Sequence, residues 1–132
     1  MRCVAIRPAE LLRVRLRSDS SAPRRARNAL EQLTEIGPVR EDVLLVASEL
    51  TTNAVKHSGA GSDAEIELCA ELIPDGLLIS VTDAGRSSSV PQIRSRKPTK
   101  PGGFGLPIVE SVSRRWGSER RRGTRVWAEL SL

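Results

Sequence analysis

The stretch VASELTTNAVKHSGAG, residues 46–61, is the most informative part of the chain. Its apolar positions recur at helical spacing, and the run that begins at Ser58 contains glycines that end the helix. Glu49, Asn53 and His57 recur at intervals of four, so they fall in one narrow stripe of that helix. Apolar residues on both sides of the stripe predict that the carboxylate and the amide face a cavity.

A carboxylate one helical turn before an amide suits magnesium-dependent chemistry. Magnesium takes hard oxygen ligands and keeps several waters, so one amide oxygen and phosphate oxygens could hold it. The carboxylate would then accept a proton from a nucleophile. A solvated polar face is the alternative that this spacing alone leaves open.

Outward from this helix, alternation of apolar and polar residues predicts strands, and apolar spacing near 3.6 predicts helices. Strands are expected at 10–17, 63–72 and 77–81, with two more in 117–132 joined at Arg122-Gly123; helices are expected at 26–36, from Pro38 to about His57, and at 105–116. The strands cluster in hairpins. This order favours an α+β fold, a two-layer sandwich of a mixed, mainly antiparallel sheet backed by helices.

The length of 132 residues suits one compact domain, so we expect residues 1–132 to form a single domain. Residues 84–104 are rich in serine, proline and basic residues, which predicts a long loop that serves as a lid over 86–104. Cys3 and Cys69 lie far apart, and a single histidine cannot complete a zinc cluster with them. No apolar run is long enough to cross a bilayer, so we expect a soluble cytoplasmic protein.

The net charge of +5 comes mainly from arginine and favours anionic partners. A nucleic-acid binder is one hypothesis, but the three aromatic residues are few for base stacking. A solvated charged surface explains the arginines better, and nucleotide phosphates or an acidic protein suit them as well. The arginines weighed for nucleic-acid binding are Arg114, Arg115, Arg120, Arg121, Arg122 and Arg125.

Three further motifs contain residues suited to nucleotide binding. Asp83 follows an apolar strand and could accept a hydrogen bond from an exocyclic amine such as that of adenine, while Gly85 lets the backbone approach a flat ring. The glycines of 102–105 open a helix, where free N–H groups could bind phosphate. Gly123-Thr124 begins the last strand. A turn aspartate and a flexible hinge are the alternatives for the first two.

Taken in order, Glu-x3-Asn, Asp-x-Gly, Gly-x-Gly-Leu and Gly-Thr resemble the N, G1, G2 and G3 boxes of the GHKL ATPases with the Bergerat fold. The chain is most similar to the short, stand-alone anti-sigma-factor serine/threonine kinases, the RsbW/SpoIIAB-like family. Residues 46–61 and 103–117 carry most of the likeness. The resemblance implies ATP and Mg2+ as cofactors and a lid that closes over the phosphates.

The resemblance also implies a role for each matched residue. Glu49 would be the general base and Asn53 the magnesium ligand. Asp83 would read adenine above Gly85. The other matched positions would bind the phosphates or support the adenine end: Gly103, Gly105 and Leu106 for the phosphates, and Thr124 for the adenine. His57 matches a histidine common at the end of the family's N box and is given no role.

The leading hypothesis is an ATP-dependent serine/threonine kinase that phosphorylates an anti-sigma-factor antagonist and sequesters a sigma factor. Its relatives often form homodimers, and the sequence leaves both a monomer and a homodimer open. The alternative is a nucleotide-loaded regulatory module that binds a protein partner without phosphoryl transfer. Ser87, which replaces the second glycine of the G1 box, favours the alternative. Neither hypothesis involves direct contact with nucleic acid or membrane.

Overall fold

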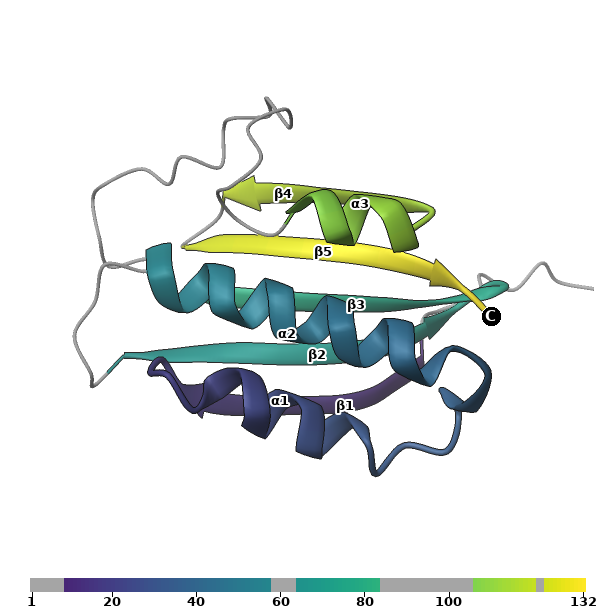
Figure 1. Ribbon diagram of the computed structural model, residues 1–132, viewed down its shortest axis with the longest axis horizontal. Helices are drawn as coiled ribbons and strands as arrows, with labels where there is room; N and C mark the ends of the chain where they lie inside the picture. Colours follow the sequence, from purple (N-terminus) through teal and green to yellow (C-terminus); the bar gives the residue numbers. More distant parts are fainter. Residues whose placement is uncertain (1–8, 58–63, 84–105, 121–122) are drawn as a thin grey trace, which may run out of the picture.

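The computed structural model describes residues 9–57, 64–83, 106–120 and 123–132. The chain forms a five-stranded sheet with helices on one of its faces (Figure 1). The strand order is β1-β2-β3-β5-β4, and every pairing between the described strands is antiparallel. In chain order the elements are β1 (Ala9–Arg17), α1 (Ala22–Leu30), a short 3-10 turn η1 (Gly37–Val39), α2 (Arg40–His57), β2 (Glu65–Ile73), β3 (Gly76–Asp83), α3 (Leu106–Val112), β4 (Arg115–Arg120) and β5 (Thr124–Ser131).

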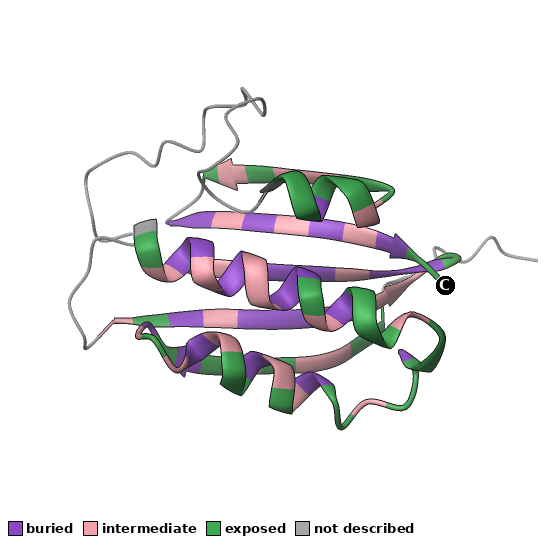
Figure 2. Cartoon of the chain, in the orientation of Figure 1, coloured by how far each residue is buried: buried purple, intermediate pink, exposed green. Residues whose placement is uncertain are grey.

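The core lies between the sheet and the helices. Residues paired in one register row, Leu68, Val81 and Val126, are all buried on the helix side. Helix α2 packs over β3 and lies between α1 and α3 (Figure 1). Its buried stripe faces the sheet, as the burial colours in Figure 2 show. The α+β class predicted from the sequence is therefore confirmed.

The β2–β3 hairpin matches the expected turn at residues 74–76. Asp75 has a positive φ of 57°, a conformation that Asp adopts more readily than most residues. Gly76 follows where space is short, because a Cβ there would come within 2.7 Å of the Leu130 carbonyl oxygen. Residues larger than glycine are thus excluded at position 76, where β3 starts beside β5.

Two of the predicted helices are shorter than the sequence indicated. Helix α1 ends at Leu30, and turns follow until η1, so the helix expected to reach residue 36 was wrong in its second half. Ile36 is fully buried all the same. Its apolar spacing reflected burial in the core, which a turn achieves as well as a helix.

The helix expected at 105–116 ends at Val112, and Trp116 lies in strand β4. The backbone N–H of Arg114 donates a hydrogen bond of 2.8 Å to the carbonyl oxygen of Glu129. From this residue onward the chain pairs with β5 and no longer forms a helix. Trp116 pairs with Ala128 and packs against the core from the sheet. A contact distant in sequence therefore ends this helix.

Candidate functional site

The two polar residues singled out on α2 lie in a largely buried stretch. Asn53 is only 3% exposed, and Glu49, one helical turn earlier, is half-buried. The apolar residues predicted to flank them are buried or partly buried: Val46, Ala47, Leu50, Ala54 and Val55. The prediction that this amide lies away from open solvent agrees with its burial.

The carbonyl oxygen of the Asn53 side chain is the most informative atom of the site. Oδ1 is buried and has no hydrogen-bond partner. Leaving a buried acceptor unsatisfied costs about 1–3 kcal/mol, and native structures tolerate few such atoms. A bound cation would satisfy this hard oxygen, so the atom fits the magnesium hypothesis.

The remaining ligands of such a cation would have to come from elsewhere. In the part of the chain that the structure describes, no group of three or more His, Cys, Asp or Glu side chains is placed to hold a metal ion. Magnesium commonly keeps several waters and takes phosphate oxygens in addition to one or two protein ligands. The residues present therefore suit a magnesium ion that arrives with a nucleotide.

Thr51 is a residue that the sequence analysis missed. It is fully buried on α2, and its hydroxyl donates to the carbonyl of Ala47 over 2.7 Å. This internal bond satisfies the hydroxyl within the helix. Thr51 and Asn53 are thus two buried polar side chains on the same helix, and only Asn53 has an unsatisfied oxygen. Its burial could have been inferred from the sequence, because Thr51 is a polar residue within an apolar stretch of the predicted helix.

Asp83 and Thr124 meet at the ends of two neighbouring strands. The backbone N–H of Thr124 donates to Oδ1 of Asp83 over 3.1 Å. Asp83 is half-buried, and Thr124 is 7% exposed. The fold therefore brings together the two residues that the resemblance assigned to the adenine end.

These pairs lie at one end of the molecule. Helix α2 and strand β3 both end there, and β5 begins there, because β3 and β5 are antiparallel neighbours (Figure 1). A pocket of about 410 Å³ adjoins Asp83 at the same end. It is lined by Arg15, Ala64, Glu65, Ile66, Glu67, Thr82 and Asp83. Among the predicted site residues that the structure describes, Asp83 is the one that lines it.

Several predicted positions lie outside the described residues. These are the glycines Gly85, Gly103 and Gly105, and the whole expected lid, residues 86–104. Leu106 is the first residue of α3 and His57 the last of α2, and the structure describes the side chain of neither. Their predicted roles stay predictions.

A comparison with protein-family models places this geometry in a known family. The model described as "Histidine kinase-like ATPase domain" matches residues 10–130. The chain belongs to this family. The match spans all the described secondary structure except its two end residues, and it includes every site residue predicted from the sequence. A search of curated proteins gave no match.

Membership of the histidine kinase-like ATPase domain family confirms the GHKL-type superfamily that the four motifs indicated. It supports ATP binding and a kinase-like regulatory role for the chain. Among the helices in the described residues, none is long and apolar enough to cross a membrane.

Proposed function

We propose that this histidine kinase-like ATPase domain is an ATP-dependent serine/threonine kinase that acts as a cytoplasmic anti-sigma factor. It would phosphorylate an anti-sigma-factor antagonist and sequester a sigma factor when unphosphorylated antagonist is absent. The observation that carries the proposal is the buried, unsatisfied Oδ1 of Asn53, one helical turn after Glu49. A module that only recognises nucleotide does not need a carboxylate at that position.

The adenine end of the site would be formed by Asp83 and Thr124. A carboxylate oxygen accepts hydrogen bonds, so Asp83 would accept one from the exocyclic amine of adenine. The Thr124 amide orients that carboxylate through the 3.1 Å hydrogen bond. Gly85 would lie under the adenine ring, and Gly103, Gly105 and Leu106 would border the phosphates.

The transfer step would use Glu49 as the base. The hydroxyl oxygen of a serine or threonine on the antagonist would form a bond to the γ-phosphorus, while the bond from that phosphorus to the bridging oxygen of ADP breaks. Glu49 would accept the hydroxyl proton. Asn53 would hold the Mg2+, which when bound with ATP would neutralise charge on the phosphates.

A second function remains open because of Ser87. Ser87 stands at the position where the G1 box of the family has its second glycine. This departure favours a nucleotide-loaded switch that binds a protein partner without phosphoryl transfer. In that case Asp83, Thr124 and Asn53 would keep their nucleotide-binding roles, and Glu49 would have no catalytic one.

The experiment that separates the two functions uses the full chain, labelled ATP and candidate antagonist proteins. The kinase is expected to transfer the labelled phosphate to serine or threonine of one antagonist and to bind a sigma factor in a pull-down with purified proteins. Binding of magnesium and ATP without transfer to any antagonist that also binds would favour the switch. Absence of ATP binding at millimolar nucleotide would contradict both functions.

A further inference from the structure

Arg114, which lies between α3 and β4, donates a hydrogen bond from every nitrogen of its guanidinium. Nε donates to Oε1 of Glu129 over 3.3 Å. Nη1 donates to the carbonyl oxygen of Asp75 over 3.3 Å, and Nη2 donates to that of Pro74 over 3.2 Å. One side chain therefore joins the end of α3 to strand β5 and to the β2–β3 turn.

The acceptors of this guanidinium form a shaped site, which we call the carbonyl socket: the carbonyl oxygens of Pro74 and Asp75 and the carboxylate of Glu129. The turn that presents the two carbonyls contains Asp75 in its left-handed conformation, with φ at 57°. Gly76 follows, and a Cβ at that position would come within 2.7 Å of Nη2 of Arg114. The absence of a side chain at position 76 thus leaves the space that the guanidinium occupies.

The backbone next to Arg114 fixes the step from helix to strand. The N–H of Ser113 donates to the carbonyl of Val109 over 3.0 Å and closes the last turn of α3, whereas the N–H of Arg114 donates to Glu129. The hydroxyl oxygen of Ser113 is buried and has no hydrogen-bond partner, which is unfavourable. The chain keeps this geometry although one polar atom is unsatisfied, so the contacts of Arg114 set the position of the step.

Helix α3 has little else to fix its position along the sheet. It is seven residues long, and a helix so short is not stable by itself. Val109 is fully buried and Val112 is partly buried, whereas Pro107, Ile108 and Glu110 are exposed. Because α3 buries little apolar surface, the contacts at its end contribute a large share of what holds it in place.

The position of α3 matters for one end of the proposed nucleotide site. Helix α3 packs beside α2, which carries Glu49 and Asn53 (Figure 1). In the proposed function Asn53 holds the magnesium, and Leu106, the first residue of α3, borders the phosphates. The adenine end, Asp83 and Thr124, is held by the pairing of β3 with β5. A shift of α3 would therefore change the phosphate end and leave the adenine end in place.

We propose that Arg114 is a positioning residue for the phosphate end of the nucleotide site, and that it acts by holding α3 at a fixed place beside α2. This inference rests on the proposed nucleotide-binding function. The carbonyl socket adjoins the start of β3, whereas Asp83 is the last residue of that strand. Eight strand residues span roughly 25 Å, so Arg114 acts without touching the nucleotide.

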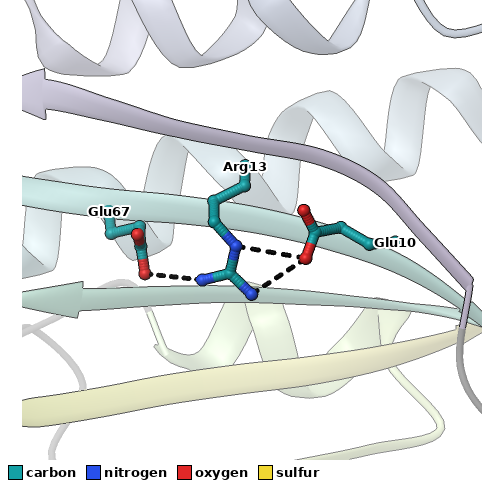
Figure 3. Close-up of polar contacts among 3 residues, drawn as sticks. All are labelled: Glu10, Arg13 and Glu67. Carbon is teal, nitrogen blue, oxygen red and sulfur yellow. Dashed lines mark hydrogen bonds and ion pairs between the residues drawn. The ribbon is translucent and has the colours of Figure 1, made fainter.

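Arg13, at the other edge of the sheet, offers a matched control. Figure 3 shows its guanidinium, which also donates from all three nitrogens: Nε and Nη2 to Glu10 over 3.1 and 2.9 Å, and Nη1 to Glu67 over 2.9 Å. These bonds join β1 to β2 and involve neither α2 nor α3. Loss of the Arg13 guanidinium thus removes the same number of hydrogen bonds without changing what holds α3.

The test compares Arg114→Met with Arg13→Met in the full chain. Methionine keeps an unbranched apolar stem but has no hydrogen to donate. Calorimetry measures the binding of ATP with magnesium and, separately, of adenosine, which has no phosphates. Arg114→Met is expected to bind ATP about tenfold more weakly, a typical size for coupling between separate sites, and to bind adenosine like the wild type. Arg13→Met should keep both affinities.

A conservative variant, Arg114→Lys, keeps the charge but replaces the planar fork by a single nitrogen that cannot reach all three acceptors. Its ATP affinity should fall between those of the wild type and Arg114→Met. Chemical denaturation checks that every variant is folded. If Arg114→Met does not fold, Arg114→Lys against Arg13→Lys makes the same comparison.

The ratio of the ATP and adenosine affinities distinguishes positioning from a general effect on the fold. Equal weakening of both ligands in the Arg114 variants would overturn the proposal, and so would wild-type affinity for ATP. A selective loss of ATP affinity in Arg13→Met as large as in Arg114→Met would overturn it as well.

Phosphoryl transfer to the antagonist is measured separately on the wild type. A selective loss of ATP affinity in Arg114→Met, in a protein that transfers no phosphate, would count against the kinase and support the role of Arg114. Transfer by a wild type whose Arg114 variants bind ATP normally would count against Arg114 alone. A wild type that binds no ATP would contradict both.

Discussion

The backbone N–H of Thr124 donates a hydrogen bond to Oδ1 of Asp83 over 3.1 Å, and the two residues are 41 positions apart in the sequence. The bond joins the last residue of β3 to the first residue of β5. It fixes one carboxylate oxygen with a backbone donor that every residue except proline would keep at position 124. The orientation of Asp83 is therefore set by the sheet.

Replacement of Asp83 by Asn should weaken ATP binding specifically. The amide oxygen would keep the bond to Thr124, which places the NH2 group where the carboxylate presented its second oxygen. A donor would then face the amine of adenine, and a charge-assisted hydrogen bond worth about 1.5–3 kcal/mol would be lost. Calorimetry should show roughly 10- to 150-fold weaker ATP binding.

The matched control for this change is Asp75→Asn, in the turn at the opposite end of β3. Its left-handed conformation accepts Asn as readily as Asp, so ATP binding should stay at the wild-type value. Equal loss of ATP binding in both variants would show that the effect of Asp83→Asn is a general one on the fold.

Replacement of Asn53 by Leu should separate stability from binding. Leu is similar in size and removes the buried, unsatisfied Oδ1. We expect the free energy of unfolding without nucleotide to rise by about 1 kcal/mol, because the buried acceptor no longer lacks a partner. Magnesium-dependent ATP binding should be lost in the same variant.

Chemical denaturation with and without magnesium and ATP measures both effects. Thr51→Val is the control, since the Thr51 hydroxyl already has a partner and its removal should bring no gain in stability. A less stable Asn53→Leu variant that binds ATP like the wild type would contradict the role given to this oxygen.

Glu49→Gln should slow phosphoryl transfer while leaving ATP affinity nearly unchanged. The amide keeps the shape of the side chain but cannot accept the hydroxyl proton, and loss of a general base costs about 10²- to 10⁴-fold in rate. Single-turnover transfer to the antagonist is the measurement. Glu41→Gln, in the exposed first turn of α2, is the control that should transfer at the wild-type rate. A wild-type rate in Glu49→Gln would rule out its role as the base.

The stability of the fold at the start of α1 should depend on pH because of the Asp19 carboxylate. Its Oδ1 accepts hydrogen bonds from the Ser21 hydroxyl at 2.6 Å and the Ser21 amide at 2.8 Å. These bonds lower the pKa of Asp19, and the bond from the Ser21 hydroxyl has the larger effect. The carboxylate therefore stabilises the fold above the unfolded pKa of about 4, and this contribution is lost as the pH falls through the lower folded value.

Unfolding of Asp19→Ala and the wild type between pH 3 and 7 tests this dependence, a range that covers the ordinary pKa of Asp, about 3.9. The difference in stability between the two proteins should be largest near neutral pH and should shrink as the pH falls below about 4. Ser20→Ala, at the neighbouring exposed serine, should show no such trend. A difference that does not vary with pH would exclude the carboxylate as its source.

Much of the fold could be predicted because local patterns decided it. The alternation at Leu12, Val14 and Leu16 gave strand β1, and the Pro74-Asp75-Gly76 turn gave the hairpin. Where the prediction failed, a distant contact decided the structure. Trp116 lies in β4 because the chain pairs with β5, and nothing in the local spacing of residues 105–116 reports that pairing.

The site shows the same division. The spacing of Glu49 and Asn53 on one helix could be inferred from the sequence alone, because both lie on one continuous element. The contact between Asp83 and Thr124 depends on β3 and β5 being neighbours in the sheet, which the separation of the two motifs along the chain does not reveal. Only the likeness to a known set of motifs connected them beforehand.

The two tryptophans give the chain internal fluorescent reporters for its two faces. Trp116 packs against the core on the helix side, whereas Trp127 lies on the other face with the Arg115 guanidinium 5.7 Å from its ring centre. The sequence contains no tyrosine, so emission excited at long wavelength comes from these two indoles. Trp116→Phe would leave only the Trp127 signal, which responds to events on the sheet face away from the helices. Trp127→Phe would leave only the Trp116 signal, which responds to changes in the core between the sheet and the helices. Spectroscopy can then follow the two sides of one sheet separately without an added dye.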